Sequence, residues 1–290
     1  MKSAIRLLGI TFFVAIIGFS MIACDHDQVT DTSPPPKVRN YEEQISFIFR
    51  LSNKFTLNEM GTVNYSEDSY KMYRITYNES AENNRRYLVI CAIHGHEEAP
   101  VYAIKDFILN LDSQENMFEN VTVDFIYILN PYGFEHHLRY NGDGHDLNRD
   151  FYKNFKTREI QILINSVKDI QYTGMFDFHE HRSSNGFFLE YYQKSNKQLA
   201  LQILRMMREN NFELDNEYID VILKSNNGEI YVTPYAKWAY ENILKQASTG
   251  VYFDKIAKEV FIFETPHKLD IESRKKMVNF LLTFLFSHTP

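Results

Sequence analysis

Two short stretches of the chain place histidine and acidic residues directly after apolar runs that have the length of strands. In the first, His94 precedes Glu97 by three residues, and in the second, His179 follows Asp177 by two. Imidazole and carboxylate groups are ligands of Zn²⁺, and a catalytic zinc site takes three protein ligands and leaves a fourth position for water. His94, Glu97 and His179 are therefore candidate metal ligands. His181 competes with His179, because residues two apart on a strand face the same side.

A carboxylate ends a third apolar run. Glu264 follows Val260–Phe263 and precedes Thr265 and Pro266. A carboxyl group at the end of such a strand is partly removed from water, which raises its pKa and suits a general base. The alternative is a structural glutamate at a strand end.

Arginines and an asparagine gather between the first two stretches. The segment contains Asn130-Pro-Tyr-Gly133, then Arg139, then Asp146-Leu-Asn148-Arg149. Because a guanidinium group forms paired hydrogen bonds to carboxylates, this loop is expected to face an anionic partner. A surface loop with ordinary salt bridges is the alternative.

The order and spacing of these motifs resemble those of the funnelin-type zinc metallocarboxypeptidases. The shared pattern is His-x-x-Glu, Asn-Pro-x-Gly, an arginine before Asp-Leu-Asn-Arg, Asp-x-His and a late glutamate at a strand end, and it spans Ile90 to Pro266. The succinylglutamate desuccinylase/aspartoacylase group is related and shares several of these motifs. The resemblance implies one Zn²⁺ per chain.

The resemblance also implies a role for each matching position. His94, Glu97 and His179 look like the zinc ligands, Glu264 like the general base and acid, Arg139 like the residue that stabilises the oxyanion, and Asn148 with Arg149 like the pair that binds the substrate carboxylate. A tyrosine before the catalytic glutamate usually covers the substrate. Tyr240 matches best, and Tyr235 and Tyr231 are competitors.

Strand-like and helix-like segments alternate from Tyr41 onward and must position these residues. Strands are expected at 70–77, 87–93, 121–129, 174–178, 186–192 and 260–263, and helices at 99–111, 157–170, 196–210, 235–246 and 271–286. The alternation predicts an α/β fold, a single-domain, mixed and largely parallel twisted sheet with helices on both faces, as in zinc carboxypeptidases. Ligands of such sheets bind beyond the carboxyl ends of the strands, where the candidate residues fall.

The first forty residues have a different composition. Lys2 and Arg6 precede an apolar run that ends in Met-Ile-Ala-Cys24, which resembles a bacterial lipoprotein signal peptide with Cys24 as the lipidated residue. An uncleaved membrane anchor is the alternative. We therefore expect a signal peptide at 1–23, a lipidated Cys24 with a flexible proline-rich tether at 24–40, and a catalytic domain at 41–290. The expected location is extracytoplasmic, on a membrane surface in the periplasm or on the cell surface.

The net charge and the cysteine content exclude some classes of function. A formal net charge of -7 argues against a nucleic-acid surface. Cys91 lies in an apolar run and is expected to be a small buried hydrophobe. The expected function is hydrolysis of an amide bond near a free carboxylate, in an extracytoplasmic peptide such as a peptidoglycan peptide. The alternatives are an N-acyl amino acid amidohydrolase and a non-catalytic binding module on the same fold.

Overall fold

The computed structural model describes residues 35–66, 68–80, 82–83, 85–114, 118, 120–217 and 223–287. The expected signal peptide, Cys24 and residues 24–34 of the expected tether lie outside these ranges. Within them, no helix combines the length and the apolar character that crossing a membrane requires.

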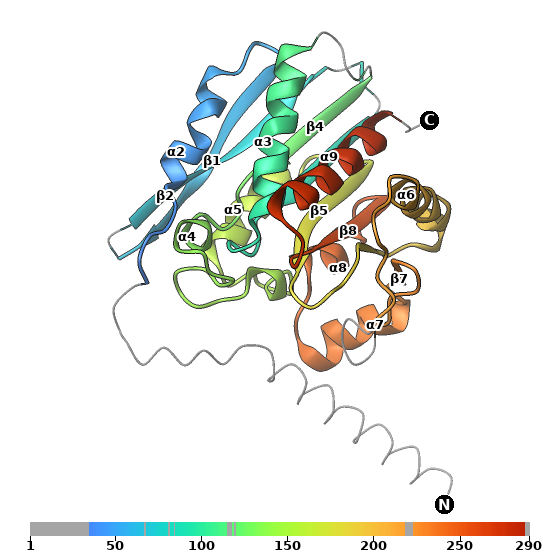
Figure 1. Cartoon of the computed structure of the whole chain (residues 1–290). Helices are drawn as coiled ribbons and strands as arrows, with labels where there is room; N and C mark the ends of the chain where they lie inside the picture. The colour runs from blue at the N-terminus through green and yellow to red at the C-terminus, as the bar shows by residue number, and fades with distance from the viewer. Residues whose placement is uncertain are drawn as a thin grey trace, which may run out of the picture.

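One mixed sheet of eight strands forms the centre of the domain, in the order β1-β2-β4-β3-β5-β8-β6-β7 (Figure 1). The strands are β1 (Phe55–Tyr65), β2 (Asp68–Tyr77), β3 (Arg85–Cys91), β4 (Val121–Ile126), β5 (Gly174–His181), β6 (Phe188–Tyr191), β7 (Glu229–Tyr231) and β8 (Glu259–Pro266). The central strands β4, β3, β5 and β8 run parallel. Antiparallel pairs join β2 to β4 and β8 to β6. The predicted mixed, largely parallel sheet is confirmed.

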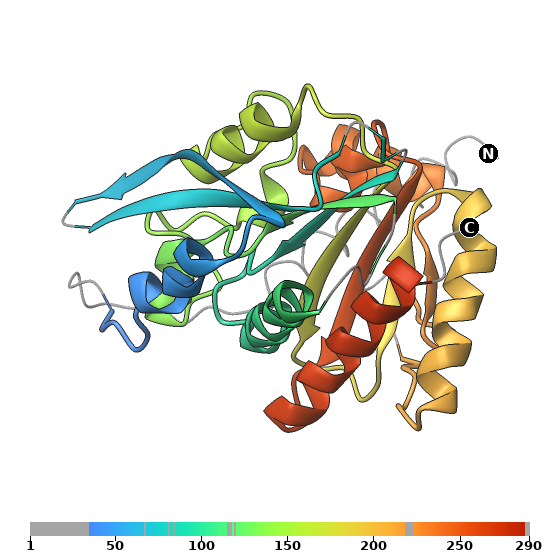
Figure 2. The same ribbon diagram turned by 90° about the horizontal axis from the view of Figure 1, so that it is seen from above.

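Helices cover both faces of this sheet. The helices are α2 (Tyr41–Ile45), α3 (Glu98–Ser113), α4 (Pro131–His136), α5 (Arg158–Val167), α6 (Lys197–Glu209), α7 (Pro234–Ala239), α8 (Thr249–Phe253) and α9 (Ile271–Ser287), and short helical turns lie at Ser46–Arg50, Leu147–Arg149, Lys194–Asn196 and Tyr240–Leu244. Figure 2 shows α3 and α9 side by side on one face and α5 on the other. The fold therefore has three layers.

Alternate side chains of β5 point to opposite faces of the sheet, one facing the hydrophobic core and the other facing the candidate site. On β5, Phe176 and Phe178 point to the α9 face, where Phe176 lies 6.2 Å from Phe286 between ring centroids. The intervening Asp177 and His179 point to the opposite face. Because β8 pairs with β5 in parallel register, Glu264 lies beside His179 on that same face.

Some elements differ from those expected. Strand β1 was not expected, because Asn58, Glu59 and Gly61 interrupt its alternation, and its register shifts at Glu59/Gly61. Residues 55–65 form a strand because they pair with β2 along its whole length. The helix expected at 235–246 is instead α7 followed by a π-helical turn at Tyr240–Leu244.

The last part of the expected tether contacts the domain. The backbone N–H groups of Val38 and Arg39 donate to the Glu135 carbonyl at 2.9 and 3.1 Å. The Pro35 carbonyl lies 2.6 Å from His136 Nδ1. The contacts of the folded domain therefore begin before Tyr41.

Candidate active site

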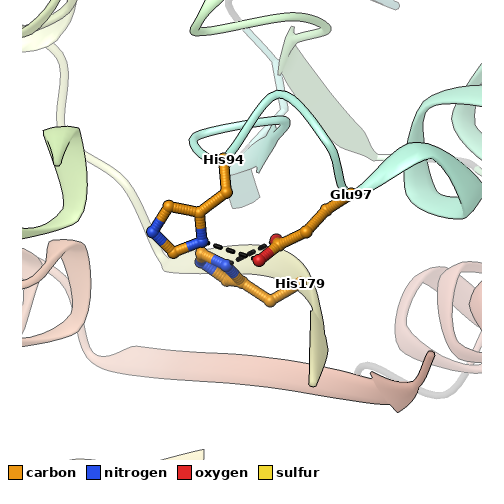
Figure 3. Close-up of side chains that lie close together, drawn as sticks. All are labelled: His94, Glu97 and His179. Carbon is orange, nitrogen blue, oxygen red and sulfur yellow. Dashed lines mark hydrogen bonds and ion pairs between the residues drawn. The ribbon is translucent and has the colours of Figure 1, made fainter. Parts of the chain in front are cut away.

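Three side chains converge at the carboxyl ends of β3 and β5 (Figure 3). His94 and Glu97 lie on the loop between β3 and α3, and His179 lies on β5. His94 Nδ1 is 2.7 Å from Glu97 Oε1, and His179 Nδ1 is 2.9 Å from Glu97 Oε2. Their ligand atoms all lie within 4.8 Å of one another, and all three residues are buried. The structure thus brings together the three residues predicted as metal ligands.

Carboxylates hold the outer nitrogens of both imidazoles. His94 Nε2 lies 3.1 Å from Asp146 Oδ1, and His179 Nε2 lies 3.0 Å from Asp177 Oδ2. Thr249 donates its hydroxyl to the same Asp177 oxygen at 2.6 Å. A carboxylate on the outer nitrogen fixes the orientation and tautomer of a metal-binding histidine, so that Nδ1 is left to face the metal.

This arrangement fits a divalent metal ion. Two imidazole Nδ1 atoms and one carboxylate are the donor set of a catalytic zinc site, although other first-row metals accept the same donors. Although burial works against ionisation, His94 and His179 lower the pKa of Glu97 well below its usual range, so the carboxylate is in its ligating form. His181 is not part of the group, and its Nδ1 accepts a hydrogen bond from the Ser184 backbone at 3.1 Å.

Close backbone packing shapes the loop that carries His94. A β-carbon built on Gly95 would lie 1.9 Å from the carbonyl carbon of Gly133, so the two segments touch backbone to backbone. Asn130 joins them, because its side chain accepts from the Gly133 N–H at 2.8 Å and donates to the Ile93 carbonyl at 3.2 Å. The Asn-Pro-x-Gly motif therefore supports the loop of the His-x-x-Glu motif.

Glu264 lies beside the metal-ligand group. It pairs in register with His179, and its Oε2 atom is buried without a hydrogen-bond partner. Burial raises the pKa of the Glu264 carboxyl well above its usual value, and the carboxylates of Glu97 and Glu190 raise it further against the opposing effect of His179. A raised pKa suits a carboxyl group that takes up and returns a proton during catalysis.

Arg139 reaches the same group from the loop after α4. Its Nη1 lies 3.5 Å from His94 Nδ1, and its Nε and Nη2 donate to Asp146 Oδ2 at 3.1 and 2.9 Å. Asp146 therefore bridges the predicted metal ligand and the arginine. Although burial opposes the charge of Arg139, Asp146 and Glu97 raise the pKa of its guanidinium group, so it stays charged.

Asn148 and Arg149 lie on the turn directly after Asp146. Asn148 Oδ1 accepts from the Thr249 N–H at 3.0 Å, and Arg149 Nη1 donates to the Asn148 carbonyl at 2.9 Å. Asn148 is thus joined to the N-terminus of α8, and Arg149 is joined to Asn148. The segment 247–253, which includes α8, lies here.

The three candidate tyrosines occupy different places. Tyr240 begins the π-helical turn and lies close to Tyr192. Tyr235 is 65% exposed and stacks against Trp238 with 6.0 Å between ring centroids. Tyr231 pairs with Tyr191 and packs against its ring, on the face opposite Glu264. The register therefore argues against Tyr231.

Asp146 and Thr249 were not predicted as site residues. Asp146 belongs to the Asp-Leu-Asn-Arg motif, but neither residue was expected to contact a metal ligand or its partner. Their contacts to His94 and Asp177 join positions 52 and 72 residues apart. Contacts between residues so far apart in the sequence cannot be predicted from the spacing of a local motif.

Comparison with solved structures identifies the class of fold. The chain resembles a Shewanella amazonensis protein assigned as a metallopeptidase (TM-score 0.68, 16% identity, 86% of this chain and 92% of that one). It also resembles the metallo-carboxypeptidase of Burkholderia cenocepacia (0.65, 16%, 88% and 69%). A third is the Pseudomonas aeruginosa metallo-carboxypeptidase in complex with (2-guanidinoethylmercapto)succinic acid (0.63, 13%, 87% and 69%). The fold is that of the metallocarboxypeptidases.

A family comparison adds a second relation. Residues 83–217 match the succinylglutamate desuccinylase/aspartoacylase catalytic domain, which is a hydrolase family. No curated protein matched the chain. The resemblance inferred from the motifs is thereby confirmed: the chain has the metallocarboxypeptidase fold, and part of it matches the desuccinylase/aspartoacylase catalytic domain.

Proposed function

We propose that the chain is a zinc-dependent hydrolase that cleaves an amide bond next to a free carboxylate, with one zinc ion per chain. One observation carries the proposal: the unpartnered, buried Oε2 of Glu264 lies beside the group formed by His94, Glu97 and His179. A binding module would not need a carboxyl group kept out of hydrogen bonds at this point.

The residues divide the chemistry between them. A zinc ion held by the three ligands would polarise the amide carbonyl and make a water molecule more acidic. Glu264 takes the proton from the attacking water and returns it to the leaving amine. Arg139 offsets the negative charge that develops on the carbonyl oxygen. Arg149 and Asn148 bind the substrate carboxylate, and Tyr240 covers the substrate.

Two substrate classes share a free carboxylate. The solved structures that resemble the chain include carboxypeptidases, which supports a C-terminal peptide bond as the target. The family match to the desuccinylase/aspartoacylase catalytic domain supports an N-acyl amino acid instead. We favour the peptide, since the lipoprotein-like N-terminus favours a location outside the cytoplasm, where peptidoglycan peptides occur.

The proposed anchor has its own test. Growth with an alkyne-labelled fatty acid should label the full chain at Cys24, and Cys24→Ser should release it from the membrane fraction. A labelled Cys24→Ser chain, or an unlabelled wild type, would contradict the anchor without affecting the chemistry.

The hydrolytic proposal is tested with the zinc-loaded full chain in detergent. Muropeptides, peptides with a free C-terminus and N-acyl amino acids are compared by mass spectrometry, for the wild type and for Glu264→Gln. The wild type should bind one zinc per chain and release an amino acid from a peptide. Glu264→Gln should keep the zinc and lose at least about 1,000-fold in kcat, in the range of general acid–base catalysis.

Each remaining result has a distinct meaning. Release from N-acyl amino acids alone would transfer the proposal to the second substrate class. Equal activity in Glu264→Gln would overturn the role of Glu264. Failure of the folded wild type to bind zinc would overturn the ligand assignment.

A further inference from the structure

A closed turn at 141–145 separates Arg139 from Asp146 in the sequence. Asn141 closes this turn twice, because its backbone N–H donates to the His145 carbonyl at 3.0 Å and its Oδ1 accepts from the His145 N–H at 2.8 Å. An asparagine side chain that bonds to the following backbone is a common device for fixing a turn. The residues on either side of the turn then meet, since Arg139 Nε and Nη2 donate to Asp146 Oδ2 at 3.1 and 2.9 Å.

The turn is also anchored to the body of the domain. Asn141 Nδ2 lies 3.3 Å from each oxygen of Glu159 on α5, and both residues are buried. The Tyr65 hydroxyl, at the end of β1, donates to Oε1 of the same carboxyl group. The Tyr65 ring packs against the turn, since a β-carbon on Gly142 would lie 2.5 Å from its Cδ1 atom. A shift of the turn would leave buried polar groups unpaired, which is costly.

Asp146 and Arg139 connect the turn to the metal-ligand group. Asp146 Oδ1 lies 3.1 Å from His94 Nε2, while Arg139 Nη1 lies 3.5 Å from His94 Nδ1. Asn141 is buried, and its side chain bonds to the turn and to α5. Its influence on the site therefore passes through the two residues that flank the turn.

We infer that Asn141 is a positioning residue, which sets the place of Arg139 and Asp146 relative to His94. It thereby governs both the affinity for the metal ion and the stabilisation of charge on the substrate. The second effect rests on the proposed function, whereas the first does not. A group displaced by about 1 Å from its productive position can lower a rate about 100-fold, so a loosened turn is expected to have a large effect.

Zinc affinity tests the inference without turnover. Competition with a chromophoric chelator compares the full chain in detergent as the wild type, Asn141→Ala, Asp146→Asn and the double variant. Asn141→Ala should weaken zinc binding about 3- to 10-fold, which is less than the roughly 10- to 100-fold effect of changing an outer partner itself. In the Asp146→Asn background, Asn141→Ala should change the affinity by less than about twofold, because the two residues act through one contact.

Turnover tests the effect that passes through Arg139. With saturating zinc, kcat and KM are measured on the substrate that the wild type cleaves, for Asn141→Ala, Arg139→Ala and the double variant. Asn141→Ala should lower kcat about 10- to 100-fold. KM should stay within about threefold, because Arg139 acts on charge that develops in the transition state. In the Arg139→Ala background, Asn141→Ala should lower kcat less than about twofold.

Asn196→Ala is the matched control. Asn196 is also buried, and its Nδ2 donates to the carbonyl of Lys258, which precedes β8 at the end of the strand opposite Glu264. The control should lose stability but keep zinc affinity and kcat. If Asn141→Ala does not fold in thermal unfolding, Asn141→Ser takes its place, because a serine hydroxyl closes such a turn more weakly. The same changes should then appear at a smaller size.

The outcomes separate this inference from the proposed function. Unchanged zinc affinity in a folded Asn141 variant, or a loss that is as large without the Asp146 carboxylate, overturns the inference. A loss of kcat that persists in the Arg139→Ala background, or equal losses of zinc affinity in Asn196→Ala, also overturns it. A loss of zinc affinity that depends on Asp146, in a chain whose wild type hydrolyses no substrate, supports the inference and overturns the proposed function.

Discussion

The Nε2 atoms of His94 and His179, which face away from the predicted metal position, each contact a carboxylate, just as their Nδ1 atoms do. Asp177 lies 3.0 Å from His179 Nε2 and is itself held by Thr249. We expect Asp177→Asn to weaken zinc binding about 10- to 100-fold, because the amide supports the ligand imidazole less well than a carboxylate. Competition with a chromophoric chelator measures the affinity. Thr249→Val, which leaves the Asp177 charge in place, should have a smaller effect.

The same contacts show how far residues can be predicted from sequence. His94, Glu97, His179 and Glu264 could be found because each lies at or just after the end of an apolar strand run. Asp146 could not, because its contact to His94 depends on how two loops fold together.

For the prediction on Asp177, a zinc affinity of folded Asp177→Asn equal to that of the wild type would show that contacts to the Nε2 atoms matter less than this geometry indicates.

Between elements, the two loops that carry the motifs depend on glycine. A methyl group on Gly95 would overlap the Gly133 backbone, which cannot give way as a flexible side chain would. We expect Gly95→Ala to lower the unfolding free energy by about 1–3 kcal/mol or more. The substitution should also weaken zinc binding, because His94 and Glu97 lie on either side of Gly95. Urea unfolding and chelator competition measure the two effects.

Gly144 provides the control for this prediction. It lies in the neighbouring loop with φ of +76° and no atom within 4 Å of its expected β-carbon. Gly144→Ala should therefore cost only backbone strain, about 1–2 kcal/mol, and leave zinc affinity unchanged. Equal losses of zinc affinity in both variants would show that loop strain, and not the contact with Gly133, governs the site.

The buried carboxyl group of Glu159 connects α5 to the segment between α4 and α5 that carries Arg139 and Arg149. Glu159 accepts from the Tyr65 hydroxyl and from Asn141 Nδ2 at 3.3 Å. Burial raises its pKa above the usual 4.5. The folded state therefore favours the protonated form, and the stability contributed by this group is complete below pH 4.5 and is lost as pH rises through the raised value.

Glu159→Gln removes this titration, because the amide is neutral at every pH. We expect the free energy of unfolding of Glu159→Gln to improve relative to the wild type between pH 4.5 and pH 7.5. Urea unfolding at both pH values measures the difference. A difference between the two proteins that is the same at both pH values would contradict the assignment.

Secondary structure could be predicted where the apolar pattern is continuous. The runs Tyr87–Cys91 of β3 and Val260–Phe263 of β8 are continuously apolar, because helices cover both faces of the sheet there. Strand β1 was missed because Asn58 and Gly61 break its alternation, and only its pairing with β2 makes it a strand. Tertiary contacts thus override weak local preference.

Across the whole molecule, the sheet order could not be predicted from sequence. Strand β4 lies between β2 and β3, and β6 and β7 extend the sheet beyond β8. No local pattern specifies these neighbours, although the fold class followed from the alternation of strands and helices. The register of β6 against β8, on which the position of Glu190 depends, is therefore known only from the structure.

The segment before α2 connects distant parts of the molecule to the site. Arg39 Nη1 donates to the carbonyls of Gly95 and Phe134, each at 3.2 Å, and its other amine pairs with Glu98. Arg39 thereby clamps the loop of the predicted metal ligands against α4. A segment expected to be part of a flexible tether is thus bound to the folded domain.

We expect this clamp to stabilise both the fold and the metal site. Arg39→Gln should lower the unfolding free energy by about 1.5–3 kcal/mol, since hydrogen bonds from a charged group are lost, and should weaken zinc binding by loosening the loop at Gly95. Lys37→Gln is the control in the same segment, because the Lys37 side chain is 47% exposed and solvent weakens its ion pairs with Asp68 and the buried Glu135, so a smaller loss is expected. Urea unfolding and chelator competition on the full chain compare the two variants. Equal, small effects of both would show that residues 35–40 lie on the domain without supporting it.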